Sequence, residues 1–507
     1  MNNIKTNCLL YRIVYIWNFC FRYIYYRTRR YSNAPKPFDT IPGLSSLPFL
    51  GPVHHFMPVI GSIGPSANFY DLAQHLYEKF GNIVKLNGIF ARANMVLLFE
   101  PKDFDQVYRA EETAPLRPGF DTLVYYQEEL RRDKYDGVYG LTTAQGLKWR
   151  DFRTKVNPVL LKPKLVKLYA PALDEISKEM ITRLNKCKHD KNYLQWNLDL
   201  EITKWSLESV AYIGLGTRLG CFQNGKENQK ANILIKCARD MMELAYKLEF
   251  FPSPWRYFAT PNFKKMIKTL DTQWEISEYY IKEAKKKIDE RKHSIPEEDK
   301  SIIEKLLAID EKVAIMMANE MLLAGIDTVA FTTIGLLYNL ATNPEVQEIL
   351  RMELQSDQSN KPYLRACLKE SMRLYPVLPA NLRRTSKEHV VAGYHIPKGV
   401  DVIAPNEFLS KLEKNYTRPM EFLPERWLVD KLDPLYYGKA HPMTTLPFGF
   451  GVRSCIGRRI AELEIETFIK RLLCDTKVSW EGPSLEVVTK VFNNFKKPYY
   501  FKFESIS

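Results

Sequence analysis

The segment Phe448-Gly449-Phe450-Gly451-Val452-Arg453-Ser454-Cys455-Ile456-Gly457 carries the strongest signal in this 507-residue sequence. It places Cys455 in a glycine-rich loop directly before a segment with a helical pattern. The pair Gly449-x-Gly451 could open a dinucleotide-binding loop, but Ser454 stands in place of the third glycine and no strand–helix unit with a downstream acid accompanies it. A helix N-terminus and a nearby arginine both favour the thiolate, which is the form of cysteine that binds a metal. We therefore expect Cys455 to be a metal ligand.

The same ten residues resemble, residue for residue, the haem-binding signature of the cytochrome P-450 monooxygenases. The resemblance implies that Cys455 is the thiolate ligand of the iron of haem b, that Arg453 binds a haem propionate and that Phe448 shields the sulfur. Gly451 and Gly457 would let the backbone approach the flat cofactor closely. A thiolate ligand pushes electron density toward the iron and favours cleavage of the O–O bond. The resemblance thus implies a monooxygenase that takes O2 as its co-substrate.

Residues 321–341 form a long apolar run in which Asp327 is the only charged residue. By length this run could span a membrane, but the central helix of a large protein is also apolar on all sides, and the polar residues of the run favour the buried helix. Ala324-Gly325-Ile326-Asp327-Thr328 resembles the oxygen-activation motif of the same family. The resemblance implies that Thr328 hydrogen-bonds the bound oxygen and that Asp327 relays protons. We expect Gly325 to open the helix locally, with close packing at Gly325 and a neutral Asp327 as the alternative.

A second group of motifs concerns charged residues that the resemblance places around the haem. Glu370 and Arg373 are three residues apart, so their side chains would share one helix face. Arg426 lies in a Phe-Leu-Pro-Glu-Arg-Trp segment that resembles the family's later Pro-Glu-Arg element. An exposed ion pair of this kind contributes little by itself. The resemblance implies that the three residues form a salt-bridged cluster beneath the haem, with a structural role.

Three further residues resemble the family's propionate-binding positions. Trp149 and Arg153 are four residues apart and match its W-x-x-x-R pair, while Arg383 matches a third propionate-binding residue. Arg384 is the immediate neighbour of Arg383, so the sequence alone leaves the choice between these two arginines open.

These motifs follow one another in the family's order over about residues 145–500. The resemblance implies a mainly α protein with minor β structure, folded as a single large cytochrome P-450 domain with a long central helix over a buried haem. Length alone would suggest about three domains; we expect one domain over 53–507, preceded by a proline-rich hinge at 32–52. Hydrophobic periodicity predicts helices and strand-rich pieces, with helices at 164–187, 199–213, 226–247 and 264–292 and β structure at 82–99, 389–404 and near 484–503.

The charge distribution points to a mitochondrial protein. The chain has 73 Lys and Arg against 59 Asp and Glu, a net charge of +14, and residues 1–31 contain six of the basic residues and no acid. An arginine-rich, acid-free N-terminus is typical of a mitochondrial transit peptide. A membrane anchor is the alternative, but Arg12 and Arg22 flank too short an uncharged run for a spanning helix of about 20 residues. We expect a transit peptide at 1–31 and a peripheral position on the matrix side of the inner membrane.

Cysteine usage and composition exclude several other classes of protein. The eight cysteines include no C-x-x-C pair, so a disulfide framework or a zinc site is not expected. Residue composition is ordinary for a globular protein and excludes a disordered, collagen-like or coiled-coil chain. The basic excess alone could indicate nucleic-acid binding, but no recognition motif accompanies it, and we expect no nucleic-acid partner.

Two basic pairs suggest the electron donor. Arg365 and Lys369 lie four residues apart beside Glu370, and Arg458-Arg459 follows the cysteine loop; both pairs are similar to those of mitochondrial members of the family. Basic side chains steer an acidic partner, so the resemblance implies an acidic [2Fe-2S] ferredoxin with its NADPH-dependent ferredoxin reductase. A microsomal-type enzyme fed by a diflavin reductase and a haem-thiolate isomerase or dehydratase are the alternatives.

The substrate class follows only from the resemblance. Segments 111–120 and 149–160 resemble arthropod mitochondrial members, which implies an apolar small molecule, either a foreign compound or a steroid-like one. An aromatic run at 250–258 followed by Lys264, Lys265 and Lys268 suits peripheral membrane contact, with ordinary core packing of the aromatic residues as the alternative. One departure from the family pattern is the connector at 355–362, which is shorter than in relatives that carry an extra short helix there.

Overall fold

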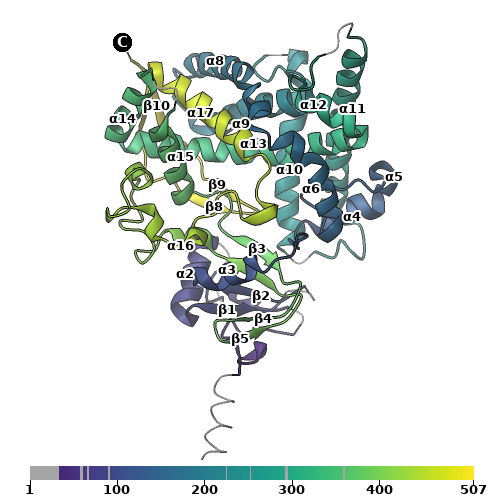
Figure 1. The fold of residues 1–507 in the computed structure, drawn as a ribbon, viewed down its shortest axis with the longest axis vertical. Coiled ribbons are helices and arrows are strands. Elements are labelled where there is room, and N and C mark those ends of the chain that lie inside the picture. The colour runs from purple at the N-terminus through teal and green to yellow at the C-terminus, as the bar shows by residue number, and fades with distance from the viewer. Residues whose placement is uncertain are drawn as a thin grey trace, which may run out of the picture.

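The computed structural model describes residues 34–48, 50–57, 61–64, 68–88, 92–223, 225–251, 253–291, 295–357 and 360–506. The predicted transit peptide at 1–31 lies outside the described residues. Helices form the larger part of the molecule, and a smaller part rich in strands lies at one end of it (Figure 1). The mainly α architecture with minor β structure agrees with the fold class predicted from the sequence.

The strand-rich part is built on a four-stranded sheet with the order β1-β2-β6-β3. Strand β6 runs parallel to β2, and the other neighbours are antiparallel. Valine and leucine side chains of β1, β2 and β6 are fully buried against α2 and α3, because β-branched and apolar residues pack well on a pleated surface. The elements are α2 (Phe69–Phe80), β1 (Ile83–Leu86), β2 (Met95–Leu98), α3 (Pro101–Arg109), β3 (Asn381–Arg384), β4 (His389–Val391), β5 (Tyr394–Ile396) and β6 (Asp401–Ala404).

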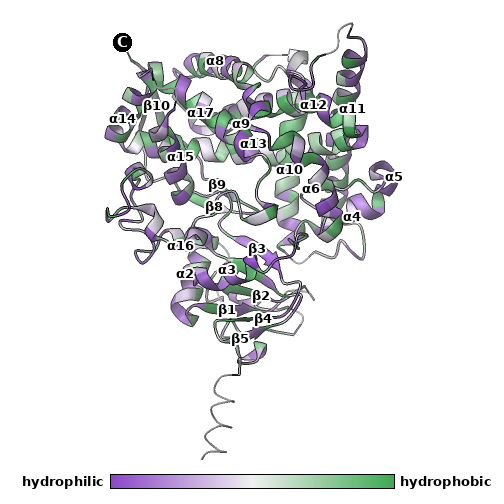
Figure 2. Cartoon of the chain, viewed as in Figure 1, coloured by the Kyte–Doolittle hydropathy of each residue, from purple (hydrophilic) through white to green (hydrophobic). Residues whose placement is uncertain are grey.

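The helical part surrounds a second hydrophobic core. Its outer helices, such as α8 and α11, carry hydrophobic residues on one face and hydrophilic residues on the other (Figure 2). The elements are α4 (Asp121–Tyr125), η3 (Tyr126–Leu130), α5 (Arg132–Tyr135), α6 (Gly146–Leu160), α7 (Pro163–Lys167), α8 (Ala170–Cys187), α9 (Lys191–Leu215), α10 (Gln229–Glu249), α11 (Pro261–Asp289), α12 (Ile302–Ile309), α13 (Glu311–Thr342), α14 (Pro344–Gln355), α15 (Pro362–Leu374), α16 (Asn406–Ser410) and α17 (Arg458–Asp475).

Helix α13 is the long central helix. It is the one helix among the described residues that is long and apolar enough to cross a membrane, but 67% of its most apolar window is buried inside the protein. The Asp310 side chain begins the helix by accepting hydrogen bonds from the amides of Lys312 and Val313, as expected for an N-cap. Helix α13 is therefore a core helix, as the sequence favoured.

Two antiparallel strand pairs complete the C-terminal region: β7 (Thr476–Trp480) pairs with β10 (Phe501–Ser505), and β8 (Val487–Thr489) pairs with β9 (Asn493–Phe495). Strand β7 follows α17 without an intervening residue, so the sequence shows no turn signal that would separate the two elements.

The proline-rich segment is irregular and contacts the sheet region at several points. Apart from the short helix η1 (Phe38–Thr40), it follows the edge of the sheet region. The amide of Lys36 donates to the Gly393 carbonyl, the amide of Lys85 donates to the Pro42 carbonyl, and Ile41 and Leu44 are buried in the core of the sheet region. These contacts attach the segment to the strand-rich part of the molecule.

The short connector joins α14 directly to α15. Both carboxylate oxygens of Glu353 accept backbone amide hydrogen bonds at the start of α15, from Tyr363 at 2.7 Å and from Leu364 at 2.9 Å. Lys361 Nζ donates to the carbonyl of Ser356 at 2.8 Å. The last turn of α14 therefore caps the first turn of α15, and the described residues of the connector form no additional helix between them.

Candidate functional site

The cysteine loop lies between the strand-rich part and α17. The Cys455 amide donates to the Phe448 carbonyl at 2.8 Å and closes the loop. Gly449 and Gly451 have φ angles of +73° and +66°, a region that favours glycine. Helix α17 begins three residues after the thiol, at Arg458. The loop thus presents one thiol beside a helix N-terminus.

The Cys455 side chain is accessible to solvent, but protein surrounds it on most sides. The resulting desolvation raises the pKa of the thiol, while the amides of Gly457 and Arg458 and the guanidinium groups of Arg153 and Arg117 lower it. The sequence identified the helix N-terminus among these groups but not Arg117 or Arg153, and desolvation outweighs all of them in the protein alone. Binding to a metal deprotonates a thiol outright, so these groups are suited to a thiolate ligand.

Four arginines gather beside Cys455: Arg117, Arg153, Arg383 and Arg453. Burial and the charges of Arg117 and Arg383 lower the pKa of Arg453 to about 9. Burial and Arg383 also lower the pKa of Arg117, and burial lowers that of Arg153. The pKa of a guanidinium group is rarely lowered in a protein, because the group remains charged under almost all conditions. Burial is the largest cause of each shift, and the repulsion between neighbouring guanidinium groups adds to it.

Some nitrogen atoms of the arginine cluster lack a hydrogen-bond acceptor, and they mark where an anionic group could bind. The Nε atoms of Arg153 and Arg453 are buried and have no hydrogen-bond partner among the described residues. Two carboxylates act on the cluster: Glu111, whose Oε1 lies 2.6 Å from Arg383 Nε, and Glu320. Four guanidinium groups against two carboxylates leave an excess of two positive charges. The two propionates of haem b match this excess, and a single thiol next to it matches the iron ligand, so the residues present fit the cofactor.

Arg383 and Arg384 point to opposite faces of β3. The Arg383 side chain donates from Nη2 to the Phe450 carbonyl at 3.1 Å, which places it against the cysteine loop. Arg384 forms a two-point ion pair with Asp401 of the neighbouring strand, at 2.7 and 2.9 Å. Side chains alternate along a strand, so only Arg383 joins the arginine cluster.

Several residues that the sequence analysis did not single out hold the arginines in place. Arg453 stacks over the Trp149 ring at 4.6 Å and donates to Gln145 Oε1 at 2.9 Å. The Gln145 amide also exchanges two 2.8 Å hydrogen bonds with the backbone of Arg117. Glu320 accepts a hydrogen bond from the Thr142 amide at 3.1 Å and fixes the same loop. Arg117 belongs to the segment 111–120, which the sequence analysis used only for its resemblance to arthropod members. The only sequence signal of Gln145 and Glu320 is their position one helical turn before Trp149 and Ala324.

One face of α13 is open in the middle of this otherwise buried helix. Ala324 is exposed and Thr328, one turn later, is half-buried, whereas Leu322, Ile326 and Val329 are buried. The Thr328 hydroxyl donates to the Ala324 carbonyl at 2.6 Å. The open face therefore carries a hydroxyl group at the position of the predicted oxygen-activation motif.

Close packing, and not the predicted opening of the helix, is what the structure shows at Gly325. Helix α13 is continuous there, and a Cβ atom on Gly325 would lie 2.9 Å from Val210 Cγ2 of α9. The Gly325 carbonyl accepts a hydrogen bond from the hydroxyl of Ser206, which also lies in α9, at 3.0 Å. The glycine permits two helices to approach each other closely.

Asp327 of α13 lies near two charged residues, Asp199 and Arg239. Burial and the charge of Asp199 raise its pKa, while Arg239 acts in the opposite direction. Asp199 is itself paired with Arg239 at 3.1 Å and with Lys497 at 2.6 Å. Asp327 is thus a carboxyl group that retains a proton more readily than usual.

The structure brings Glu370, Arg373 and Arg426 together in a cluster with no exposed surface. Glu370 accepts hydrogen bonds from Arg373, from Arg426 and from the Trp427 indole at 2.8 to 3.0 Å. The remaining guanidinium donors bind backbone carbonyls of 410 and 417–421. A buried ion pair is stable only when its remaining donors and acceptors are satisfied in this way.

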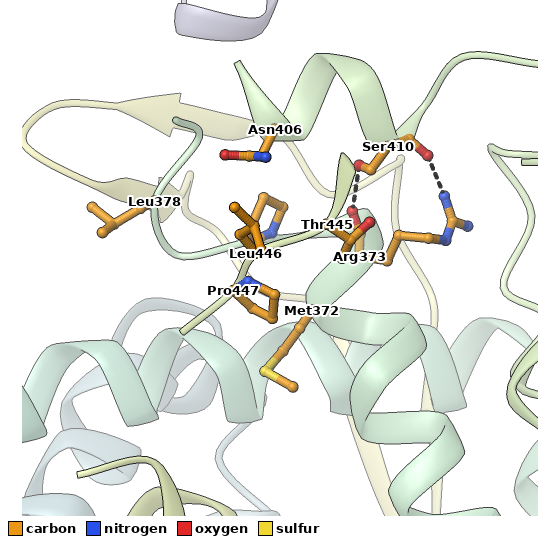
Figure 3. Close-up of a pocket in the computed structure, with 9 residues that line it drawn as sticks. Met372, Arg373, Leu378, Asn406, Ser410, Thr445, Leu446 and Pro447 are labelled. Atoms are coloured by element: carbon orange, nitrogen blue, oxygen red, sulfur yellow. Dashed lines mark hydrogen bonds between the residues drawn. The ribbon is translucent and has the colours of Figure 1, made fainter. Parts of the chain in front are cut away.

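A small pocket lies next to this cluster, between α15, α16 and residues 445–447 (Figure 3). Two hydrogen bonds between Arg373 and Ser410 cross its rim: Arg373 Nη1 donates to the Ser410 carbonyl, and Ser410 Oγ donates to the Arg373 carbonyl. Its lining includes Pro447, which precedes the cysteine loop, but neither Cys455 nor the arginine cluster. The pocket therefore belongs to the structural cluster and not to the site around the thiol.

The four basic residues predicted to contact a redox partner are all exposed. Arg365 of α15 lies 3.5 Å from Glu466 of α17, and Arg458 binds Glu462 at 2.8 Å, one turn from Glu466. Lys369 lies over the Trp427 ring. Arg459 donates to the Leu161 carbonyl. The two basic pairs thus border a common surface formed by α15 and α17.

The family model for cytochrome P450 matches residues 42–503 of the chain. This chain therefore belongs to the cytochrome P-450 family, and it is a monooxygenase, an oxidoreductase. The match begins within the proline-rich segment and spans both the cysteine loop and α13.

Among curated proteins, the chain is similar to several fly enzymes of this family. It is 37% identical over 496 residues to "Cytochrome P450 CYP12A2" of Musca domestica, covering 93% of this chain and 91% of that protein. It is 36% identical to "Probable cytochrome P450 12a5, mitochondrial" of Drosophila melanogaster, with 93% and 91% covered, and 38% identical to "Probable cytochrome P450 12b2, mitochondrial" of the same species, with 88% and 85% covered. The similarity to arthropod members, several of them named mitochondrial, agrees with the resemblance seen in the sequence.

Proposed function

We propose that this chain inserts one atom of O2 into an apolar small molecule, either a foreign compound or a steroid-like one, using electrons from a mitochondrial ferredoxin. Residues 53–507 would act as a single haem-thiolate domain. The observation that carries the proposal is the cluster of four arginines with two unneutralised charges next to one accessible thiol.

Haem b, held by Cys455, supplies the activation of O2 and the oxidising power of the reaction. The chain's own residues bind and orient it: Arg117, Arg153, Arg383 and Arg453 bind the propionates, and Trp149 supports Arg453 from below. Phe448 would cover the sulfur on the side of the loop.

On α13, the Thr328 hydroxyl would donate a hydrogen bond to the bound oxygen, and Asp327 would relay protons. Burial and Asp199 raise the pKa of Asp327 while Arg239 lowers it, and the side chains of Arg239 and Lys497, which both pair with Asp199, are partly exposed. A carboxyl group of this kind can pass a proton inward and regain one from the surface. The exposed Ala324 leaves room for oxygen beside the Thr328 hydroxyl.

Electrons would enter through the surface formed by α15 and α17. Arg365, Lys369, Arg458 and Arg459 place positive charge there, and an acidic [2Fe-2S] ferredoxin reduced by its NADPH-dependent reductase is complementary to it. Several curated relatives carry the word mitochondrial in their names, which supports import of this chain into the mitochondrion.

Peripheral membrane contact would use the segment between α10 and α11. Phe250, Phe251, Tyr257 and Phe258 are exposed, and lysines follow in α11. Trp255 differs from the expectation because it is buried and stacks on Phe263 with centroids 5.0 Å apart. The exposed aromatic residues are sufficient for an interfacial contact on the matrix side of the inner membrane.

The decisive experiment compares the purified protein with its Cys455→Ser variant. The reduced, carbon monoxide-treated protein should show the absorption band of a thiolate-ligated haem, and the variant should lose that band while still folding by circular dichroism. Haem binding without the band in the unchanged protein would contradict the proposed ligand.

The electron donor is tested by NADPH consumption. We expect turnover with ferredoxin and ferredoxin reductase and none with a diflavin reductase; the reverse result would identify the microsomal type. Product formation without any reductant would instead identify an isomerase or dehydratase.

A further inference from the structure

Glu320 is a buried acid of α13 that none of the steps of the proposed function uses. Its side chain is 7% exposed. It stands one helical turn before Ala324 and two turns before Thr328, so the three residues share one face of the helix. The charge of Glu320 also acts on Arg117 of the arginine cluster. The acid therefore extends the face that carries Thr328 toward the arginine cluster.

The loop at 140–145 lies directly against Glu320. Both carboxylate oxygens accept a hydrogen bond from the Thr142 amide, at 3.1 and 3.3 Å, and Oε2 also accepts one from the Thr142 hydroxyl. A Cβ atom on Gly140 would overlap Glu320 Oε1 and would lie 2.6 Å from Met316 Cε. Only a glycine therefore lets the loop approach α13 so closely, and Glu320 accepts the two hydrogen-bond donors that Thr142 brings there.

The other end of the same loop holds two members of the arginine cluster. The Ala144 carbonyl accepts a hydrogen bond from Arg453 Nη2, and Gln145 Oε1 accepts one from Arg453 Nη1 at 2.9 Å. Gln145 also exchanges two 2.8 Å hydrogen bonds with the backbone of Arg117. Because Thr142 and Gln145 are only three residues apart, a displacement of the loop at Thr142 would also move the groups that hold these arginines.

We propose that Glu320 ties the arginine cluster to the open face of α13 by holding the loop at 140–145. This inference rests on the proposed function, in which Arg117 and Arg453 bind the haem propionates. Among the described residues, the hydrogen bonds of Glu320 go to Thr142 and not to a guanidinium group, so Glu320 acts through the loop and is a positioning residue. The propionate-binding groups are thereby held in a fixed position relative to the Thr328 hydroxyl.

The test uses the haem-loaded full-length protein with substitutions at each step of this path. Glu320→Leu removes the acceptor, Glu320→Gln keeps the shape and an acceptor, and Gln145→Leu removes a contact with the arginines. Thr142→Val removes a hydroxyl that donates to Glu320. Thr333→Val is its matched control, because the buried Thr333 hydroxyl donates within α13, to the Val329 carbonyl at 2.8 Å.

The rate of haem transfer to apomyoglobin measures how firmly the propionates are held. Transfer should accelerate about three- to tenfold in Glu320→Leu and about tenfold in Gln145→Leu, as expected for lost hydrogen bonds. In the double variant Glu320→Leu/Gln145→Leu the acceleration should be smaller than the product of the two single effects, because both changes interrupt one path. In Glu320→Leu/Arg383→Ala the effects should multiply, because Arg383 is held by Glu111 and the Phe450 carbonyl and not by this loop.

Two further measurements separate positioning from a general loss of stability. Hydrogen–deuterium exchange of a peptide covering residues 138–146 should rise about three- to tenfold in Glu320→Leu, because the Thr142 amide loses its acceptor. The propionate bending modes in resonance Raman spectra report hydrogen bonding to the propionates, and they should shift in Glu320→Leu and Gln145→Leu. Thr142→Val should exchange and transfer haem about threefold faster, whereas Thr333→Val should match the unchanged protein. Glu320→Gln should stay within about threefold of the unchanged protein in both rates.

The proposal is overturned if Glu320→Leu leaves haem transfer unchanged, if Thr142→Val behaves like Thr333→Val, or if the effects of Glu320→Leu and Gln145→Leu multiply. It is also overturned if Glu320→Gln matches Glu320→Leu, since the charge of the acid and not its hold on the loop would then be responsible. If Glu320→Leu does not load haem, the comparison of Thr142→Val with Thr333→Val still decides. Absence of the thiolate–haem band from the unchanged protein would instead contradict the proposed function.

Discussion

Arg383 and Arg384 are neighbours in the chain but have different partners. Arg383 lies against the Phe450 carbonyl and Glu111 in the arginine cluster, whereas Arg384 is paired with Asp401 within the sheet. Arg383 is buried and Arg384 is half-buried, but both are arginines, so the residue type does not distinguish them. The alternation of side chains along β3 does.

The two arginines should therefore respond differently to substitution. Arg383→Ala removes one guanidinium group that we propose binds a propionate, and the rate of haem transfer to apomyoglobin should rise about tenfold or more, the value of one charge-assisted hydrogen bond. Arg384→Ala is the matched control, and its haem transfer should stay within about twofold of the unchanged protein. Equal acceleration in both variants would contradict the assignment.

At this scale the sequence displayed the proposed haem ligand but not its surroundings. Cys455 and Arg453 stand in a ten-residue pattern that a sequence displays completely. Gln145 and Glu320 stand in no such pattern. Gln145 matters because it accepts a hydrogen bond from Arg453, and Glu320 because it accepts one from the Thr142 amide; in both pairs the two residues are far apart in the sequence. Contacts of this kind are set by the fold and leave no local pattern.

Helices α13 and α9 pack closely at Gly325. The sequence pointed to this glycine, but a glycine inside a helix permits either an opening or a close approach, and only the position of Val210 decides between the two. The same limit applies to boundaries. The periodic stretch at 164–187 is divided between α7 and α8, and β7 was not predicted because no turn precedes it.

Gly325→Ala should destabilise the protein because its new methyl group would lie too close to Val210. Overpacking of this kind costs about 1–3 kcal/mol, which exceeds the gain of about 0.5–1 kcal/mol in helix propensity. Chemical denaturation of the single variants, Gly325→Ala and Val210→Ala, and of the double variant measures the effect. The double variant should be more stable than the sum of the two single changes predicts. Additive losses would show that Val210 is not the residue in contact.

The short elements η3 and α5 are fastened to α11 by Asp271. Its carboxylate accepts hydrogen bonds from Arg131 at 2.6 and 2.9 Å and from the Tyr126 hydroxyl at 2.8 Å. Burial alone would raise the pKa of Asp271, but these donors hold it below its ordinary value. The carboxylate thus stabilises the fold only while it is ionised.

This contact should make the stability of the protein depend on pH. A carboxyl group with a lowered pKa in the folded state contributes its full stabilisation above the unfolded value of about 3.9 and loses it as the pH falls through the folded value. Asp271→Asn should therefore cost about 1–2 kcal/mol near pH 7, and the difference from the unchanged protein should shrink below about pH 4. Denaturation midpoints across this range measure it, and a difference that does not change with pH would contradict the explanation.

Over the whole molecule, the net charge of +14 divides into separate parts. Six positive charges lie in residues 1–31, four arginines surround the cysteine loop, and two basic pairs border the surface formed by α15 and α17. The fold brings together groups that are hundreds of residues apart in the chain, as Arg117 and Arg453 show. Composition revealed the excess charge but not this arrangement.

Reversing the charge of the basic residues on the α15 surface should specifically weaken the binding of the electron donor. The variant Arg365→Glu/Lys369→Glu should raise the KM for ferredoxin about tenfold or more at low ionic strength with little change in kcat, and the effect should diminish as salt is added. Lys282→Glu on the exposed face of α11 is the control and should behave like the unchanged protein. A loss of haem or of kcat in the double variant would show that these residues support the fold and not the docking.

The unneutralised arginines also bear on how much of this protein a cell can maintain. A newly made chain without the proposed cofactor has four guanidinium groups in one buried region against the carboxylates of Glu111 and Glu320, and we expect the two propionates of the haem to neutralise the remaining positive charge. Binding to the folded state alone shifts the folding equilibrium in proportion to the concentration of free ligand. The abundance of the enzyme should therefore follow the supply of haem in its compartment, since chains without it are the ones that proteases reach first.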